Sequence, residues 1–140
     1  MIVLIDTNII LNILLKQAAF YTGSKMIFDL AEIGQISGYI SASAITDIFY
    51  IAQKDLGKTG VREAIQHLLS VFKPATVTDN HIYQALDIEW SDFEDSVQFV
   101  VGESLSADYI ITRNTQDFAS SSIPAVTPEQ FIQLITDTEK

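Results

Sequence analysis

Four carboxylates from distant parts of the chain are the residues best placed to do chemistry: Asp6, Asp47, Asp95 and Asp117. Asp6 directly follows the apolar run of residues 2–5, which is typical of a buried parallel strand. Asp117 follows a second apolar run, residues 109–112, in the turn formed by residues 113–118. Ligands of open α/β sheets bind at the carboxyl ends of the strands. We therefore expect Asp6 and Asp117 at that edge.

The other two acids are predicted near the N-termini of helices, which gather at the same edge of a parallel sheet. Asp47 lies four residues after Ser43, a candidate N-cap, and Asp95 stands in the same relation to Ser91. Each acid alone is accounted for by an ordinary role, as a helix cap, a partner of the helix dipole, a solvated first-turn acid or a turn residue. Their joint placement favours one shared cleft.

Clustered carboxylates repel one another, so such a cleft needs a cation. The chain has no cysteine, and neither of its two histidines lies near these segments. The available ligands are therefore hard oxygens, which favour Mg²⁺ or Mn²⁺. A Mg²⁺ ion held by a few carboxylates and several waters suits phosphoryl transfer.

Helix-like and strand-like segments alternate along the whole chain, without a linker, repeat or low-complexity tract. Strands are predicted at residues 2–5, 39–41, 75–78 and 109–112. Helices are predicted at residues 8–15, 26–31, 45–57, 61–72, 79–86 and 91–105, with a last one from residue 128. Capping boxes mark two starts, Ser91 with Glu94 and Thr127 with Gln130. This alternation predicts an α/β fold with a parallel sheet covered by helices on both faces.

Composition predicts one soluble, cytoplasmic domain. The 140 residues are 48% hydrophobic and 19% charged, which excludes a disordered chain. Without cysteine there is no disulfide framework, zinc–thiolate site or thiol nucleophile, and a reducing compartment fits. The apolar start lacks a basic segment and is interrupted by Asp6, Asn8 and Asn12, so neither a signal peptide nor a membrane span is expected.

Four segments, in order and spanning nearly the whole chain, resemble the PIN domain family. They are Ile-Val-Leu-Ile-Asp-Thr-Asn-Ile-Ile from residue 2, Ile-Thr-Asp-Ile from 45, Asp-Phe-Glu-Asp-Ser-Val-Gln from 92 and Ala-Asp-Tyr-Ile-Ile-Thr-Arg-Asn-Thr-Gln-Asp-Phe from 107. The last two are the most specific. The resemblance implies one three-layer α/β/α domain over residues 1–140, with a central, mostly parallel sheet. It also implies a metal-dependent ribonuclease, most often the toxin of a bacterial toxin–antitoxin pair.

The resemblance assigns roles residue by residue. Asp6 and Asp95 match core metal-binding acids, whereas Asp47 stands where the family more often has glutamate, and its shorter side chain would move or weaken the metal. Asn114 stands where many members have an acid, so either Asp117 takes over or Asn114 serves as a neutral oxygen ligand. Supporting groups that orient acids or waters are Thr7, Asn8, Ser43 and Thr112.

The implied reaction is hydrolysis of an RNA phosphodiester by a water activated at one or two cations. The four aspartates hold the cations, and one of them also takes the proton of the water. A net charge of −10 opposes this function, because RNA is a polyanion. Local bases, Arg113, Lys54 and Arg62, could form a modest phosphate track, whereas Lys58 is better explained as a solvated charge. We therefore expect either weak affinity for RNA or a narrow, structured RNA target.

The same acidic surface suits a basic partner such as an antitoxin tail. The apolar stripes of residues 45–52 and 61–72 fit a homodimer interface, although burial within one chain explains the same pattern.

Particular residues bear on three rival functions. A haloacid-dehalogenase-like phosphatase needs a second aspartate two residues after the first, where this chain has Asn8. A phospho-accepting receiver domain needs a lysine after a late strand, where this chain has Arg113. The third, a PIN fold that no longer cleaves and acts as a binding module, is kept open by Asp47 and Asn114.

Overall fold

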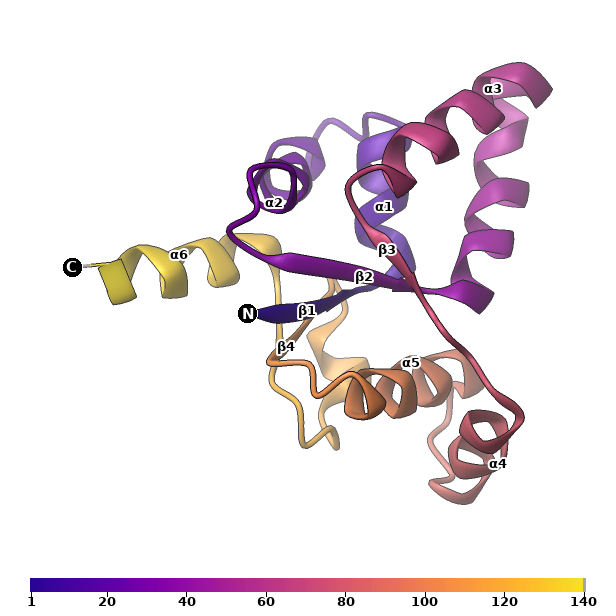
Figure 1. The fold of residues 1–140 in the computed structure, drawn as a ribbon, viewed down its shortest axis with the longest axis vertical. Helices are drawn as coiled ribbons and strands as arrows, with labels where there is room; N and C mark the ends of the chain where they lie inside the picture. The colour runs from indigo at the N-terminus through magenta and orange to yellow at the C-terminus, as the bar shows by residue number, and fades with distance from the viewer. Residues whose placement is uncertain (140) are drawn as a thin grey trace.

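Five parallel strands form one sheet in a computed structural model of the chain, which describes residues 1–139. Figure 1 shows helices on both sides of this sheet. The strands lie in the order β3-β2-β1-β4-β5, and every neighbouring pair is parallel. Their bounds are β1 Ile2–Ile5, β2 Ser37–Ser41, β3 Lys73–Ala75, β4 Tyr109–Ile111 and β5 Ala125–Val126. The predicted α/β class and its parallel sheet are confirmed.

Helices cover both faces of the sheet, which completes the expected three layers. One face carries α1 Thr7–Leu14, α2 Tyr21–Glu32, α3 Ala42–Leu69 and α6 Pro128–Glu139. The other carries α4 Asp79–Asp87, α5 Phe93–Ser104 and the 3₁₀ helix η1 Thr115–Phe118. Successive side chains of β1 point to opposite faces of the sheet, so the strand packs against both helix layers. Val3 and Ile5 belong to the first hydrophobic cluster, and Leu4 belongs to the second.

Helix α3 consists of two arms separated at Gly57, which has non-helical backbone angles (φ +75°, ψ 171°). The chain turns back at this point, at the upper right of Figure 1. A glycine at positive φ carries no Cβ penalty, so it is a favourable residue for the break. The sequence prediction placed a helix end near Gly57 and a second helix over residues 61–72, whereas the second arm ends at Leu69.

The structure differs from the sequence prediction at the two edge strands of the sheet. The strand expected at residues 75–78 is β3, Lys73–Ala75, so it lies earlier in the chain and contains Pro74. Proline is tolerated there because β3 is an edge strand and need not donate from every residue. Strand β5 was not predicted, because two residues are too short to show a periodic pattern.

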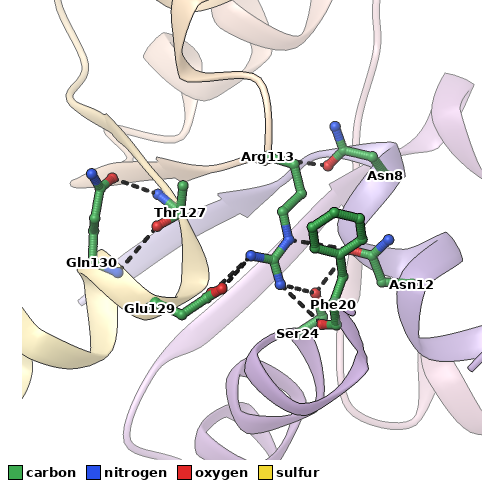
Figure 2. A network of polar contacts seen from close by, with 8 residues as sticks. All are labelled: Asn8, Asn12, Phe20, Ser24, Arg113, Thr127, Glu129 and Gln130. Carbon is green, nitrogen blue, oxygen red and sulfur yellow. Dashed lines mark hydrogen bonds and ion pairs between the residues drawn. The ribbon is translucent and has the colours of Figure 1, made fainter. Parts of the chain in front are cut away.

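Thr127 and Gln130 form the predicted capping box at the start of α6. The Gln130 N–H donates to Thr127 Oγ1 at 3.1 Å, and the Thr127 N–H donates to Gln130 Oε1 at 2.9 Å (Figure 2). Within residues 1–139, no helix combines the length and the apolar character needed to cross a membrane.

Gly38 on β2 faces the fully buried ring of Phe72, and a Cβ there would lie 2.5 Å from Phe72 Cδ1. We expect Gly38→Ala to lower the free energy of unfolding by about 1–3 kcal/mol through overpacking. Urea denaturation checks this, with Gly60→Ala as the control, because a Cβ at Gly60 meets only Leu56 Cβ at 3.5 Å. Equal stability of the two variants would contradict the packing described for β2.

Candidate active site

Asp6 lies at the carboxyl end of β1, where it is also the N-cap of α1. Its side chain is 6% exposed, and both carboxylate oxygens accept hydrogen bonds. Oδ1 accepts from the Thr7 N–H at 2.7 Å and from Gln98 Nε2 at 3.0 Å, and Oδ2 accepts from Thr112 Oγ1 at 2.7 Å. The cap role and the site position therefore coincide in one residue, whose carboxylate is held by three separate segments.

Thr112 connects the loop after β4 to Asp6. Its hydroxyl donates to Asp6 Oδ2 and accepts from the Asn114 N–H at 3.0 Å. Asn114 is the N-cap residue of η1, and Asp117 lies within that short helix with an exposed side chain. The structure thus brings the second predicted strand end, with Thr112 and Asn114, directly against Asp6.

The start of α5 differs from the prediction. Asp92, and not Ser91, is the N-cap, and its Oδ1 accepts from the Asp95 N–H at 3.0 Å. An aspartate caps a helix as well as a serine does, so the helix starts one residue later. The predicted capping box is therefore wrong, and Glu94 Oε1 accepts from Thr7 Oγ1 at 3.2 Å instead. Glu94, expected only as a capping-box residue, thus contacts the segment that follows Asp6.

Asp95 sits in the first turn of α5 in a partly buried position. Burial is the largest cause that raises the pKa of its carboxyl to about 7, and neighbouring negative charges raise the pKa further. In decreasing order these charges belong to Asp92, Asp6, Asp117 and Glu94. Asp95 is therefore within electrostatic reach of two of the other predicted site acids.

Glu94 connects the remaining predicted acid to this group. Burial raises the pKa of Glu94, the hydrogen bond from Thr7 opposes the rise, and the charges of Asp47, Asp6 and Asp92 add to it. Asp47 itself is exposed on α3. The four predicted aspartates therefore lie around one edge of the sheet, together with Glu94 and Asp92, whose inclusion was not predicted.

The N-cap of α3 is Ser41, so the prediction of Ser43 as the cap is wrong. The helix begins two residues earlier, which places Asp47 in its second turn. Ser43 was predicted to support the site. Its hydroxyl Oγ lies 3.4 Å from the Oγ of Ser41, so this hydrogen bond joins two serines.

The chemistry of this donor set fits a hard divalent cation. All the clustered side chains offer oxygen, and within residues 1–139 the ion pairs are Lys25–Asp29 and Arg113–Glu129, neither of which neutralises the site acids. Among residues 1–139, the side-chain oxygen Oε1 of Gln98 is buried and has no hydrogen-bond partner. It belongs to the same amide as Nε2, which donates to Asp6. However, no group of three or more acidic or histidine side chains in the described part of the chain is already arranged to hold an ion.

The three predicted RNA contacts occupy different environments. Lys54 and Arg62 are exposed on α3, with the Arg62 guanidinium 5.6 Å from the centre of the Phe49 ring. The Arg113 side chain is only 13% exposed and points away from the strand end into the helices α1, α2 and α6 (Figure 2). Its backbone N–H donates to Asn8 Oδ1 at 3.3 Å, so Asn8 supports the loop after β4.

Sequence reasoning missed Gln98, although one signal was available. Gln98 is a polar residue inside the apolar run of residues 97–101, and it is 1% exposed. A buried polar side chain needs a hydrogen-bond partner, so its position on α5, three residues after Asp95, could have pointed to the carboxylate of Asp6.

Comparisons with known proteins agree with this architecture. The sequence model of a family described as "PIN domain" matches residues 2–116. The chain is similar in structure to a chain of VapBC2 from Rickettsia felis, solved bound to a DNA fragment from the promoter, with a TM-score of 0.68, 16% identity and coverage of 90% of this chain and 97% of that one. It is also similar to a chain of a toxin–antitoxin complex from Klebsiella pneumoniae, with a TM-score of 0.67, 22% identity and the same coverage. No curated protein matches significantly.

The electrostatics predict that Asp95 destabilises the metal-free protein at neutral pH. The folded protein keeps the Asp95 proton up to about pH 7, whereas an unfolded chain releases it near the ordinary value of 3.8, so stability falls as pH rises between these values. In EDTA at pH 8, we expect Asp95→Asn to raise the free energy of unfolding by about 1–2 kcal/mol, a value reduced for solvent screening. The gain should vanish near pH 4.

Denaturation of both proteins at the two pH values checks this expectation. A variant that is less stable than wild type at pH 8 would show that Asp95 is not under repulsion in the folded state.

Proposed function

Because the chain belongs to the PIN domain family, we propose that it is a metal-dependent ribonuclease that hydrolyses RNA phosphodiester bonds. The observation that carries this proposal is that acids without a cationic partner lie within electrostatic reach of one another near the buried Asp6, at the edge of the sheet where ligands bind. Burial, and then the charges of the neighbouring acids, raise the pKa of Asp95 and Glu94 and cost stability, which favours a role in binding a cation.

The residues proposed to hold Mg²⁺ or Mn²⁺ are Asp6, Asp47, Asp95 and Asp117, with Glu94 added from its contact with Thr7. A divalent cation bound by these acids would neutralise the charge that builds on the phosphate and would lower the pKa of the attacking water. Asn114 stays a candidate neutral ligand.

The chain's own residues orient the reacting groups. Gln98, Thr112 and the Thr7 N–H fix the Asp6 carboxylate, so its free lone pairs keep one direction. One of the site acids takes a proton of the water as the water oxygen bonds to phosphorus. The bond from phosphorus to the ribose oxygen breaks, and that oxygen leaves as an alcohol after taking a proton from solvent. These neutral donors hold Asp6 without cancelling its charge.

Lys54 and Arg62 are the proposed phosphate contacts, because they are exposed on α3 whereas the Arg113 donors are used inside the protein. With a net charge of −10, a short track of two bases gives weak non-specific binding. The proposed substrate is therefore a structured RNA recognised at a small site, in the cytoplasm.

We assign the protein to the toxin side of a toxin–antitoxin pair. Support comes from the likeness to chains of toxin–antitoxin complexes from Rickettsia felis and Klebsiella pneumoniae, together with the family match. The acidic surface suits a basic antitoxin segment, and a homodimer stays a proposal that the exposed Tyr50 and Ile51 on α3 would fit.

A second candidate function is a non-catalytic PIN-fold binding module. It is favoured by the lack, among residues 1–139, of a carboxylate group already arranged for an ion, and by Asp47 in place of the longer glutamate. Metal-dependent cleavage distinguishes the two candidates.

Cleavage of a panel of structured RNAs by the purified protein should require Mg²⁺ or Mn²⁺ and stop in EDTA. We expect Asp95→Asn to lower the rate about 100-fold or more, because a ligand and a charge are lost. The matched control is Asp108→Asn, since Asp108 Oδ2 accepts from the Ile2 N–H at the opposite edge of the sheet. An equal loss in both variants, or cleavage that persists in EDTA, would contradict the assignment.

Expression in a bacterial host without the antitoxin provides a second test. Wild-type protein should arrest growth within a few generations, because RNA cleavage removes a needed transcript, and Asp95→Asn should not. Growth curves at matched protein levels check this. Arrest by both proteins would favour the binding module.

A further inference from the structure

Arg113 stands between two residues of the candidate site but sends its own side chain elsewhere. Thr112 binds Asp6 through its hydroxyl, and the Asn114 N–H binds that same hydroxyl. The guanidinium of Arg113 lies among α1, α2 and α6, as Figure 2 shows. Arg113 therefore joins the loop after β4 to three helices, α1, α2 and α6. None of the predicted metal ligands lies within these helices.

Each nitrogen of the guanidinium has a partner. Nε donates to Asn12 Oδ1 at 3.3 Å, and Nη2 donates to the Phe20 carbonyl at 2.9 Å and to Ser24 Oγ at 3.1 Å. Nη1 pairs with both carboxylate oxygens of Glu129. The ring of Phe20 also lies against the guanidinium, with its centre 4.9 Å from Cζ. A charged group this engaged and this little exposed fixes the backbone that carries it.

The partners of Arg113 are themselves held in place. Asn12 is 4% exposed and Ser24 is fully buried, and the Ser24 hydroxyl donates to Asn12 Oδ1 at 3.0 Å. Glu129 lies in the first turn of α6, between Thr127 and Gln130, the two residues of the capping box. The clamp therefore consists of a cation and partners whose positions are set by other contacts.

Gly23 on α2 makes room for the acid of this clamp. A Cβ at Gly23 would lie 2.6 Å from Glu129 Oε2 and 2.9 Å from Glu129 Cδ. Glu129 approaches Arg113 across the space where a side chain at residue 23 would stand. It also lies beyond the segment matched by the family model, which ends at residue 116.

Resting on the proposed function, we propose that Arg113 is a positioning residue for the metal site. Clamped by Glu129, Asn12 and Ser24, it holds the segment of residues 112–117, so that Thr112 stays on Asp6 and Asn114 and Asp117 stay at the carboxylate cluster. The clamp acts from outside the cluster. Loosening it lowers the affinity for divalent metal while the fold persists, because the groups that orient metal ligands typically contribute about 10–100-fold in affinity.

Gly23→Ala is the sharpest perturbation, because it removes no polar group. The added methyl displaces the flexible end of Glu129, and alanine is a better helix former than glycine, so folding is retained. Gly60→Ala is the matched control, since it is also a helical glycine-to-alanine change but meets only an ordinary contact at 3.5 Å. Thermal unfolding verifies that all variants are folded.

We expect Gly23→Ala and Glu129→Ala each to raise the Mn²⁺ dissociation constant about 10-fold in calorimetric titrations, with Gly60→Ala unchanged. The double variant should also lose about 10-fold and not about 100-fold, because without the Glu129 carboxylate the methyl at residue 23 has nothing to displace. A loss of about 100-fold in the double variant would overturn the proposal. It would show that the two substitutions weaken Mn²⁺ binding independently, and not through the same Glu129 contact.

Hydrogen exchange of the Asn114 amide separates the clamp from the metal chemistry. That N–H donates to Thr112 Oγ1, so its exchange should be about 10-fold faster in Gly23→Ala and unchanged in Gly60→Ala. Two results for Gly23→Ala overturn the positioning role: faster exchange of the Asn114 amide with unaltered Mn²⁺ affinity, or unaltered exchange. Both leave the proposed function standing. Wild-type protein that binds no Mn²⁺ contradicts the proposed function, and the inference falls with it.

Discussion

The carboxylate of Asp6 is buried among neutral donors from three segments, while further acids surround it at the same edge of the sheet. Neutral donors satisfy the lone pairs of a buried carboxylate but leave its charge in place, so the neighbouring acids still feel it. Burial is the largest cause that raises the pKa of Asp95 and of Glu94, and the charge of Asp6 adds to both, after Asp92 for Asp95 and after Asp47 for Glu94. Among residues 1–139, no group of three or more acids is already arranged to hold an ion.

The fold supplies the framework that tolerates this repulsion. Three residues of β1 are fully buried between two hydrophobic clusters, so the strand that delivers Asp6 is rigid. The first turn of α5 delivers Asp95, and the loop after β4 delivers Asn114 and Asp117. Away from the acids, Arg113 and Glu129 tie that loop to the C-terminal helix. The stability needed by the site is thus provided by apolar packing on both sides of the sheet, and the largely buried Arg113 side chain is paired with the exposed Glu129.

The layer order and the edge that carries the acids were predictable, because apolar runs and helical stripes are local signals with a clear period. Local signals were less reliable where two residues compete for one role. Serine and aspartate are both favourable N-cap residues, so Ser91 and Asp92 compete for the cap of α5. Asp92 is the cap, and Glu94 contacts Thr7 and not the backbone of Ser91. The roles of Gln98 and Arg113 depend on partners about 90 to 100 residues away in the sequence, which no periodicity reports. Contacts of that kind require the structure.

The central claim is that the repelling carboxylates form a binding site for a divalent cation. A crystal structure of the protein grown with Mn²⁺, phased or checked by the anomalous signal of manganese, tests it most directly. The account predicts a manganese peak at the carboxyl edge of the sheet, with Asp6 and Asp95 among its ligands and the other acids drawn toward it. Manganese found only elsewhere on the surface, with the carboxylates still apart at a saturating concentration, would contradict the account.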